Sequence, residues 1–168
     1  MLVAVMVMLI VATAVMALIL VGLRQLDSQG SRSSSLDDAR TAVSKIVREV
    51  RQAAQVTAVG PGTVDVLVPV IVGPGDASAT HWVRFDCTPS IGGELYRCTR
   101  RDVTAGGAEV ELVRGIVNTD TFTVDGTART VSIRLAQDVE GAGNPLVLED
   151  AATARNCVDG AGALVPCL

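Results

Sequence analysis

The side chains that most often carry chemistry are scarce in this chain. His81 is the only histidine, and no cysteine, aspartate or second histidine stands at a spacing typical of a metal site or a catalytic triad. Serines gather between positions 28 and 35, and none lies in a Gly-x-Ser-x-Gly pattern. Glu109 and Glu111 do not have the spacing of a calcium-binding loop. We therefore expect no catalytic residue, no metal and no cofactor, and we interpret His81 as a strand or surface histidine.

Four cysteines are the other reactive groups: Cys87, Cys98, Cys157 and Cys167. Their number is even and no Cys-x-x-Cys occurs, which favours disulfides over a zinc site. Three connectivities are formally possible, and locality favours Cys87 with Cys98 and Cys157 with Cys167. Disulfides indicate an oxidising compartment.

Charge restricts the class of partner. The chain has 168 residues and a net charge of −4, and residues 61–168 hold eight basic and fourteen acidic side chains. Nucleic-acid-binding domains are usually basic. We expect no nucleic acid among the partners.

The first 23 residues form the most distinctive stretch. No charge interrupts the run from Leu2 to Leu23, whose length as a helix would be about 33 Å, close to the ~30 Å of a bilayer core. The run predicts a transmembrane or filament-core helix over residues 1–23. The residues that we expect to mediate membrane or assembly contacts are Leu2, Ile10, Ala14, Leu18 and Gly22.

Residues 24–60 are expected to hold a linker and a second helical segment. Gly30 and the nearby serines weaken a helix between Arg24 and Ser35. From Leu36 to Val59, apolar residues recur at steps of three and four, which predicts an amphipathic helix ended by Gly60-Pro61-Gly62. Its apolar stripe is Ala39, Val43, Ile46, Val47, Val50, Ala53 and Ala54.

Residues 61–168 change to a period of two, which is typical of strands. Gly92-Gly93 is a hairpin signal that pairs residues whose numbers sum to 185, and Cys87 and Cys98 have that sum. Asp125-Gly126 is a second hairpin signal, which would place Phe122 on one face with Val131. We predict an α+β fold, with a long N-terminal helix, half transmembrane and half amphipathic, packed on an antiparallel sheet head with disulfides.

This order of elements resembles the type IV pilin superfamily, and most of all the J-type minor pseudopilins of type II secretion systems. The residues that carry the resemblance are the apolar run from Met1, the helix end from Ile46 to Ala53, Glu94 to Arg97, and Arg155-Asn156. The family's basic prepilin leader and its Phe-Thr-Leu-x-Glu segment are absent, and we expect the true start upstream of Met1.

The resemblance implies a structural subunit of a type IV pilus or a type II secretion filament. Its partners would be other pilin or pseudopilin subunits, the inner-membrane assembly platform and the lipid bilayer. The head would lie outside the cytoplasmic membrane, or the chain would sit in a periplasmic or extracellular filament. The alternative is a single-pass, membrane-anchored, extracytoplasmic binding domain.

Overall fold

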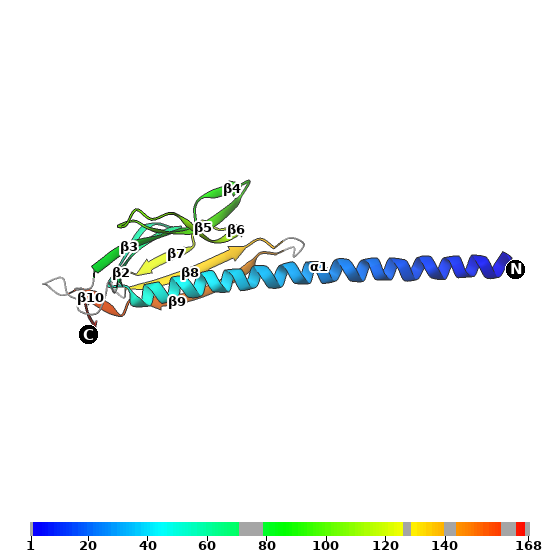
Figure 1. Cartoon of the computed structure of the whole chain (residues 1–168), viewed down its shortest axis with the longest axis horizontal. Coiled ribbons are helices and arrows are strands. Elements are labelled where there is room, and N and C mark those ends of the chain that lie inside the picture. Colours follow the sequence, from blue (N-terminus) through cyan, green and yellow to red (C-terminus); the bar gives the residue numbers. More distant parts are fainter. Residues whose placement is uncertain (1, 71–78, 126–128, 140–143, 159–163, 167–168) are drawn as a thin grey trace.

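One long helix projects from a head made of strands (Figure 1). The structure, a computed structural model, describes residues 2–70, 79–125, 129–139, 144–158 and 164–166. Helix α1 (Leu2–Gln52) is unbroken, so the expected linker over Arg24–Ser35 is wrong. Gly30 and the serines each cost at most about 1 kcal/mol in a helix, and a segment flanked by helix on both sides needs no new nucleus.

The helix ends seven residues before the predicted end at Val59, because the C-terminal part of the chain caps it. The Asn156 side chain donates to the Gln52 carbonyl at 2.7 Å, and the Arg155 N–H donates to the Arg51 carbonyl at 3.2 Å. Residues 55–60 are rich in β-branched side chains and form a strand instead. Gly60-Pro61-Gly62 is therefore a turn between strands and not a helix stop.

Eleven strands follow the helix. They are β1 (Gln55–Gly60), β2 (Thr63–Val70), β3 (Ala79–Asp86), β4 (Ser90–Gly92), β5 (Leu95–Asp102), β6 (Val110–Ile116), β7 (Phe122–Asp125), β8 (Thr130–Gln137), β9 (Leu146–Thr153), β10 (Asn156–Val158) and β11 (Leu164–Pro166). Nine of them form one antiparallel sheet in the order β1-β2-β3-β5-β6-β8-β7, with β4 paired to β5 and β9 to β8. Strands β10 and β11 form a separate hairpin.

The large sheet curls until its two ends meet. The Phe122 N–H at the start of β7 donates to the Pro61 carbonyl in the β1–β2 turn at 2.8 Å. In the same turn, the Gly62 carbonyl accepts from the Cys87 N–H, also at 2.8 Å. The sheet is therefore nearly closed around its core.

Two predicted registers can be compared with the sheet. Strands β3 and β5 pair Val83 with Asp102 and Asp86 with Thr99, which confirms the sum of 185. In the second hairpin Phe122 pairs with Ile133, so the pairing is centred two residues later than Asp125-Gly126 predicted. A shift by an even number of residues leaves each side chain on the same face of the sheet, so the predicted apolar face of the hairpin is correct.

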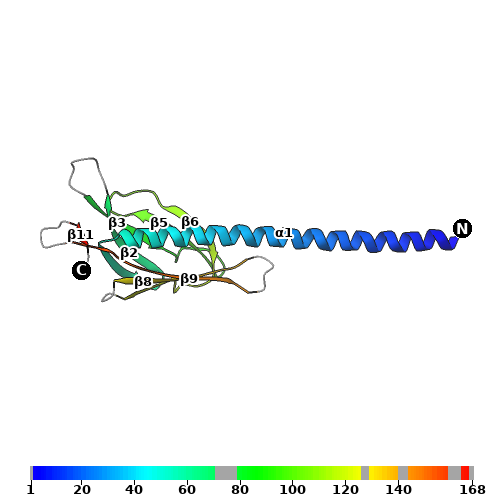
Figure 2. The same cartoon turned by 90° about the horizontal axis from the view of Figure 1, so that it is seen from below.

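The second half of α1 lies against this curled sheet (Figure 2). All seven residues of the predicted apolar stripe are buried: Ala39, Val43, Ile46, Val47, Val50, Ala53 and Ala54. All of them except Ala54 belong to one hydrophobic core with residues of β2, β3, β6, β8 and β9, whose largest fully buried side chains are Phe85, Ile116, Ile133 and Leu135.

The fold class expected from the sequence needs correction. The sheet that α1 lies against is nearly closed, which the expected sheet head did not include, and α1 has no division into two segments. Within the described part of the chain, no helix combines the length and the apolar character that crossing a membrane requires. The transmembrane half of the expected fold is therefore contradicted.

Candidate interaction surface

The N-terminal half of α1 stands clear of the head (Figure 1). Its described side chains, those of Met6, Met8 and residues 11–21, are exposed and mostly apolar. Every residue from Val11 to Val21 is exposed, and three turns of helix cover the whole circumference. Met8 is 77% exposed, Met16 63% and Leu18 73%. An apolar surface of this kind is typical of an interaction site.

The predicted contact residues lie along this part of the helix. Ala14 and Leu18 are exposed, and Gly22 is partly exposed. Their four-residue spacing puts them on one face. Leu2 and Ile10 are positions of α1, but their side chains lie outside the described part of the structure. A side chain at Gly22 would meet no atom within 4 Å, so this face is open to a neighbour.

A charged pair fixes the other half of α1 to the sheet. The Arg100 Nε on β5 donates to both carboxylate oxygens of Glu49, at 2.9 and 3.0 Å. The Glu49 side chain is only 12% exposed and that of Arg100 27%. The pair joins positions 51 residues apart and sets the angle between helix and head.

A groove runs along the seam between α1 and β9. Its larger part has a volume of about 500 Å³ and a smaller extension about 170 Å³, and both are lined by Ser44 and Asp150. Arg40, Arg48 and Arg51 stand along its helix wall and are exposed. Among the described residues none of these three makes an ion pair within 4 Å.

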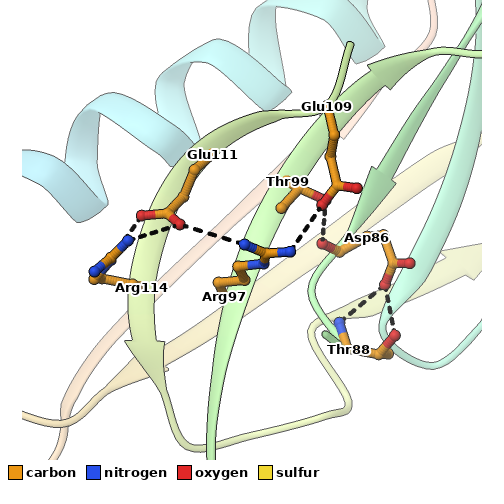
Figure 3. Close-up of polar contacts among 7 residues, drawn as sticks. All are labelled: Asp86, Thr88, Arg97, Thr99, Glu109, Glu111 and Arg114. Carbon is orange, nitrogen blue, oxygen red and sulfur yellow. Dashed lines mark hydrogen bonds and ion pairs between the residues drawn. The ribbon is translucent and has the colours of Figure 1, made fainter. Parts of the chain in front are cut away.

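Other arginines of the head are paired on the sheet surface (Figure 3). Arg97 lies between Glu109 at 3.6 Å and Glu111 at 4.0 Å. Arg114 donates to both Glu111 oxygens, and this hydrogen bonding lowers the pKa of Glu111. Arg97 and Arg100 of β5 are therefore both paired with carboxylates.

A second polar network in the same view secures the end of β3. One Asp86 carboxylate oxygen accepts from the Thr88 N–H at 2.9 Å and from the Thr88 hydroxyl at 2.6 Å (Figure 3). The Thr99 hydroxyl donates to the Asp86 carbonyl at 3.2 Å. These bonds fix the start of the loop that carries β4.

His81 is a strand residue, as predicted, but it has an acidic partner that sequence spacing did not indicate. Its Nδ1 lies 3.1 Å from an Asp102 oxygen on β5. The other Asp102 oxygen accepts from the Ala105 N–H at 2.8 Å, and this bond, aided by His81, lowers the pKa of Asp102. Both side chains line a cavity of about 340 Å³ together with Glu49 and Arg100. Within the described residues, no three His, Cys, Asp or Glu side chains gather in a way that could hold a metal ion.

Cys87 and Cys98 form the predicted disulfide at the base of a hairpin made of β4 and the start of β5. Gly92 and Gly93 have φ values of 127° and 59°, which explains the glycines at this turn. Pairing within the hairpin is irregular, with a register shift between Ser90 and Gly92. The predicted pairing of Cys157 with Cys167 lies outside the described residues.

Comparison of the chain with family models, curated proteins and solved structures gives no match. The assignment of function therefore rests on the surfaces described above.

Proposed function

We propose that this chain is a structural subunit of a filament, a pilin-like or minor pseudopilin-like protein of a type IV pilus or type II secretion system, that assembles through its N-terminal helix. The observation that carries the proposal is the projecting part of α1 from Val11 to Val21, where every side chain is exposed and all but Thr13 are apolar. A helix apolar on all sides needs cover on all sides. Packing among the helices of neighbouring subunits supplies it.

The magnitudes support this interpretation. Among the described residues of α1, nine large apolar side chains are exposed: Met6, Met8, Val11, Val15, Met16, Leu18, Ile19, Leu20 and Val21. Full burial of each contributes on the order of 1.5–3 kcal/mol, or roughly 13–27 kcal/mol in all. That gross gain is comparable with or larger than the roughly 4–15 kcal/mol that association costs in lost freedom of motion.

The rest of the chain suits a subunit that holds its helix rigidly. The unbroken α1 and the Glu49–Arg100 pair transmit the orientation of the helix to the head. The Cys87–Cys98 disulfide supports an extracytoplasmic location for that head. The partners that we propose are other subunits of the same type and the platform that assembles them.

The test places a single cysteine on the projecting helix of the full chain. We expect Leu18→Cys to form crosslinked dimers with a short bismaleimide, whereas Thr123→Cys, on the exposed surface of β7, stays monomeric. Leu18→Arg should abolish large assemblies in sedimentation, and Thr123→Arg should leave them intact. Equal behaviour of the position 18 and position 123 variants would contradict assembly through the helix.

A second candidate is an extracytoplasmic binding domain, and the cavity beside His81 favours it. The cavity of about 340 Å³ is lined by cationic and anionic groups, including Arg48, Arg100 and Asp102. Such a domain would act through the head and would not need copies to associate. The Leu18 experiment separates the two candidates, because only a filament subunit crosslinks along the helix.

A further inference from the structure

The β4–β5 hairpin is built to present its tip rigidly. The Cys87–Cys98 disulfide closes its base, and the tip runs from Ser90 to Glu94. Ile91 is 43% exposed although its side chain is large and apolar. Glu94 is exposed and makes no ion pair with any described residue. An apolar and an acidic group therefore stand together on a pinned projection.

The α1–β9 groove offers the complementary chemistry. Its helix side carries the guanidinium groups of Arg40, Arg48 and Arg51, which have no ion-pair partner among the described residues. Apolar lining comes from Val43 and Val47 of the helix and Leu148 of β9. The β9 side also carries Asp150 and Glu149, and Glu149 is already paired with Arg134 at 3.2 Å. A ligand for this groove should combine an apolar side chain with a carboxylate, as the hairpin tip does.

The dimensions of the two surfaces agree. From the disulfide to the tip the hairpin is about five residues long, which is roughly 16 Å for extended chain. From Arg40 to Arg51 the groove follows eleven residues of helix, which is roughly 17 Å. The hairpin can therefore lie along most of the groove.

The hairpin and the groove lie on opposite sides of the head. In Figure 1, β4 rises from the side of the sheet away from α1, while the groove lies between α1 and β9. A hairpin in this position cannot reach the groove of its own chain. Its partner must be another molecule.

We propose that the β4–β5 hairpin of one copy docks in the α1–β9 groove of the next copy, with Ile91 on the apolar lining and Glu94 against Arg48 and its neighbours. This inference rests on the proposed function, because it names the head contact that accompanies helix packing. Two different surfaces on opposite sides make a head-to-tail contact, which leaves each assembly open for addition of further copies. A filament requires contacts of that kind.

The test combines two variants of the full chain, Ile91→Cys and Ser44→Cys, the latter in the groove wall. A bismaleimide leaves the Cys87–Cys98 disulfide intact, and the chain without an added cysteine gives the background. We expect mixed dimers only when both variants are present, at a yield at least fivefold above a mixture of Ile91→Cys with Thr123→Cys. Glu94→Arg and Arg48→Glu should each lower the yield at least fivefold, and the two changes together should restore it.

The outcomes separate this contact from the proposed function. If Leu18→Cys crosslinks but the hairpin and groove cysteines do not exceed the Thr123 control, the docking is refuted and assembly through the helix stands. If the charge reversals act without mutual rescue, the assigned pairing is refuted. If Leu18→Cys also fails to crosslink, both proposals are overturned.

Discussion

The ion pair between Glu49 and Arg100 should stabilise the chain asymmetrically. Removal of one partner from a fully buried pair costs about 3–5 kcal/mol, because a charge is left without its counterpart. In Arg100→Met the stranded group is the Glu49 carboxylate, whose side chain is 12% exposed, and we expect a loss of about 2–3 kcal/mol. In Glu49→Gln the stranded group is the guanidinium, whose side chain is 27% exposed and reaches water, and we expect about 1–2 kcal/mol.

The double variant should be less damaged than the sum of the single variants. With both charges removed no uncompensated charge remains, so we expect the coupling between the sites to be about 1.5–2.5 kcal/mol. The assay is urea denaturation followed by fluorescence of Trp82, the only tryptophan, which lies on β3. Arg114→Met serves as the matched control and should shift the midpoint least, because the Glu111 carboxylate that it strands is 32% exposed and keeps Arg97 at 4.0 Å. Equal losses for the two single variants, or coupling below about 0.5 kcal/mol, would refute the reasoning.

Two further predictions concern the head. Gly62→Ala should destabilise the chain by about 1–3 kcal/mol, because the new methyl group would stand 2.6 Å from the Thr88 Cγ2 and 2.7 Å from the Thr119 carbonyl oxygen. The control is Gly60→Ala, whose methyl group meets no atom within 4 Å. Equal urea denaturation midpoints for the two variants would contradict this prediction. Asp102 has a pKa lowered in the folded chain, so its contribution to stability is present above the ordinary value of 3.8 and is lost as the pH falls through the lower folded value. Asp102→Asn should therefore reduce the loss of folding stability as the pH falls below 3.8, measured by urea denaturation at several pH values. An unchanged pH dependence in that range would contradict the lowered pKa of Asp102.

The parts of the fold that were predicted correctly have clear local signals. The register of β3 with β5 was indicated both by Gly92-Gly93 and by the spacing of Cys87 and Cys98. The buried stripe followed from seven apolar positions at helical spacing, of which the first five lie in α1 and Ala53 and Ala54 directly follow it. Each signal depends on residues that are close in sequence, where periodicity is informative.

The errors arose where distant parts of the chain decide the structure. The helix ends at Gln52 because Asn156, more than a hundred residues later, takes its last carbonyls. The near closure of the sheet depends on a bond from Phe122 to Pro61, which no local pattern indicates. Segment 24–35 has poor helix formers, but the flanking helix overrides them.

The candidate surfaces were only partly visible in the sequence. Exposure of Ala14 and Leu18 agrees with an assembly role that the apolar run indicated. The pair of His81 with Asp102 could have been found from the predicted register, which places the two residues diagonally on one sheet face. The groove lined by Arg40, Arg48 and Arg51 could not have been found from the sequence, because it forms only where β9 lies beside α1.

The near closure of the sheet has a consequence for behaviour at high concentration. An open strand edge is a template for further strands and leads to amyloid-like growth. Here β1 and β7 lie against each other and β9 lies beside α1, so the edges left among the described strands are short, such as the three-residue β4 and β11 and the part of β6 before its pairing at Ile116. Copies held side by side in an ordered array therefore offer one another less unpaired backbone than an open sheet would.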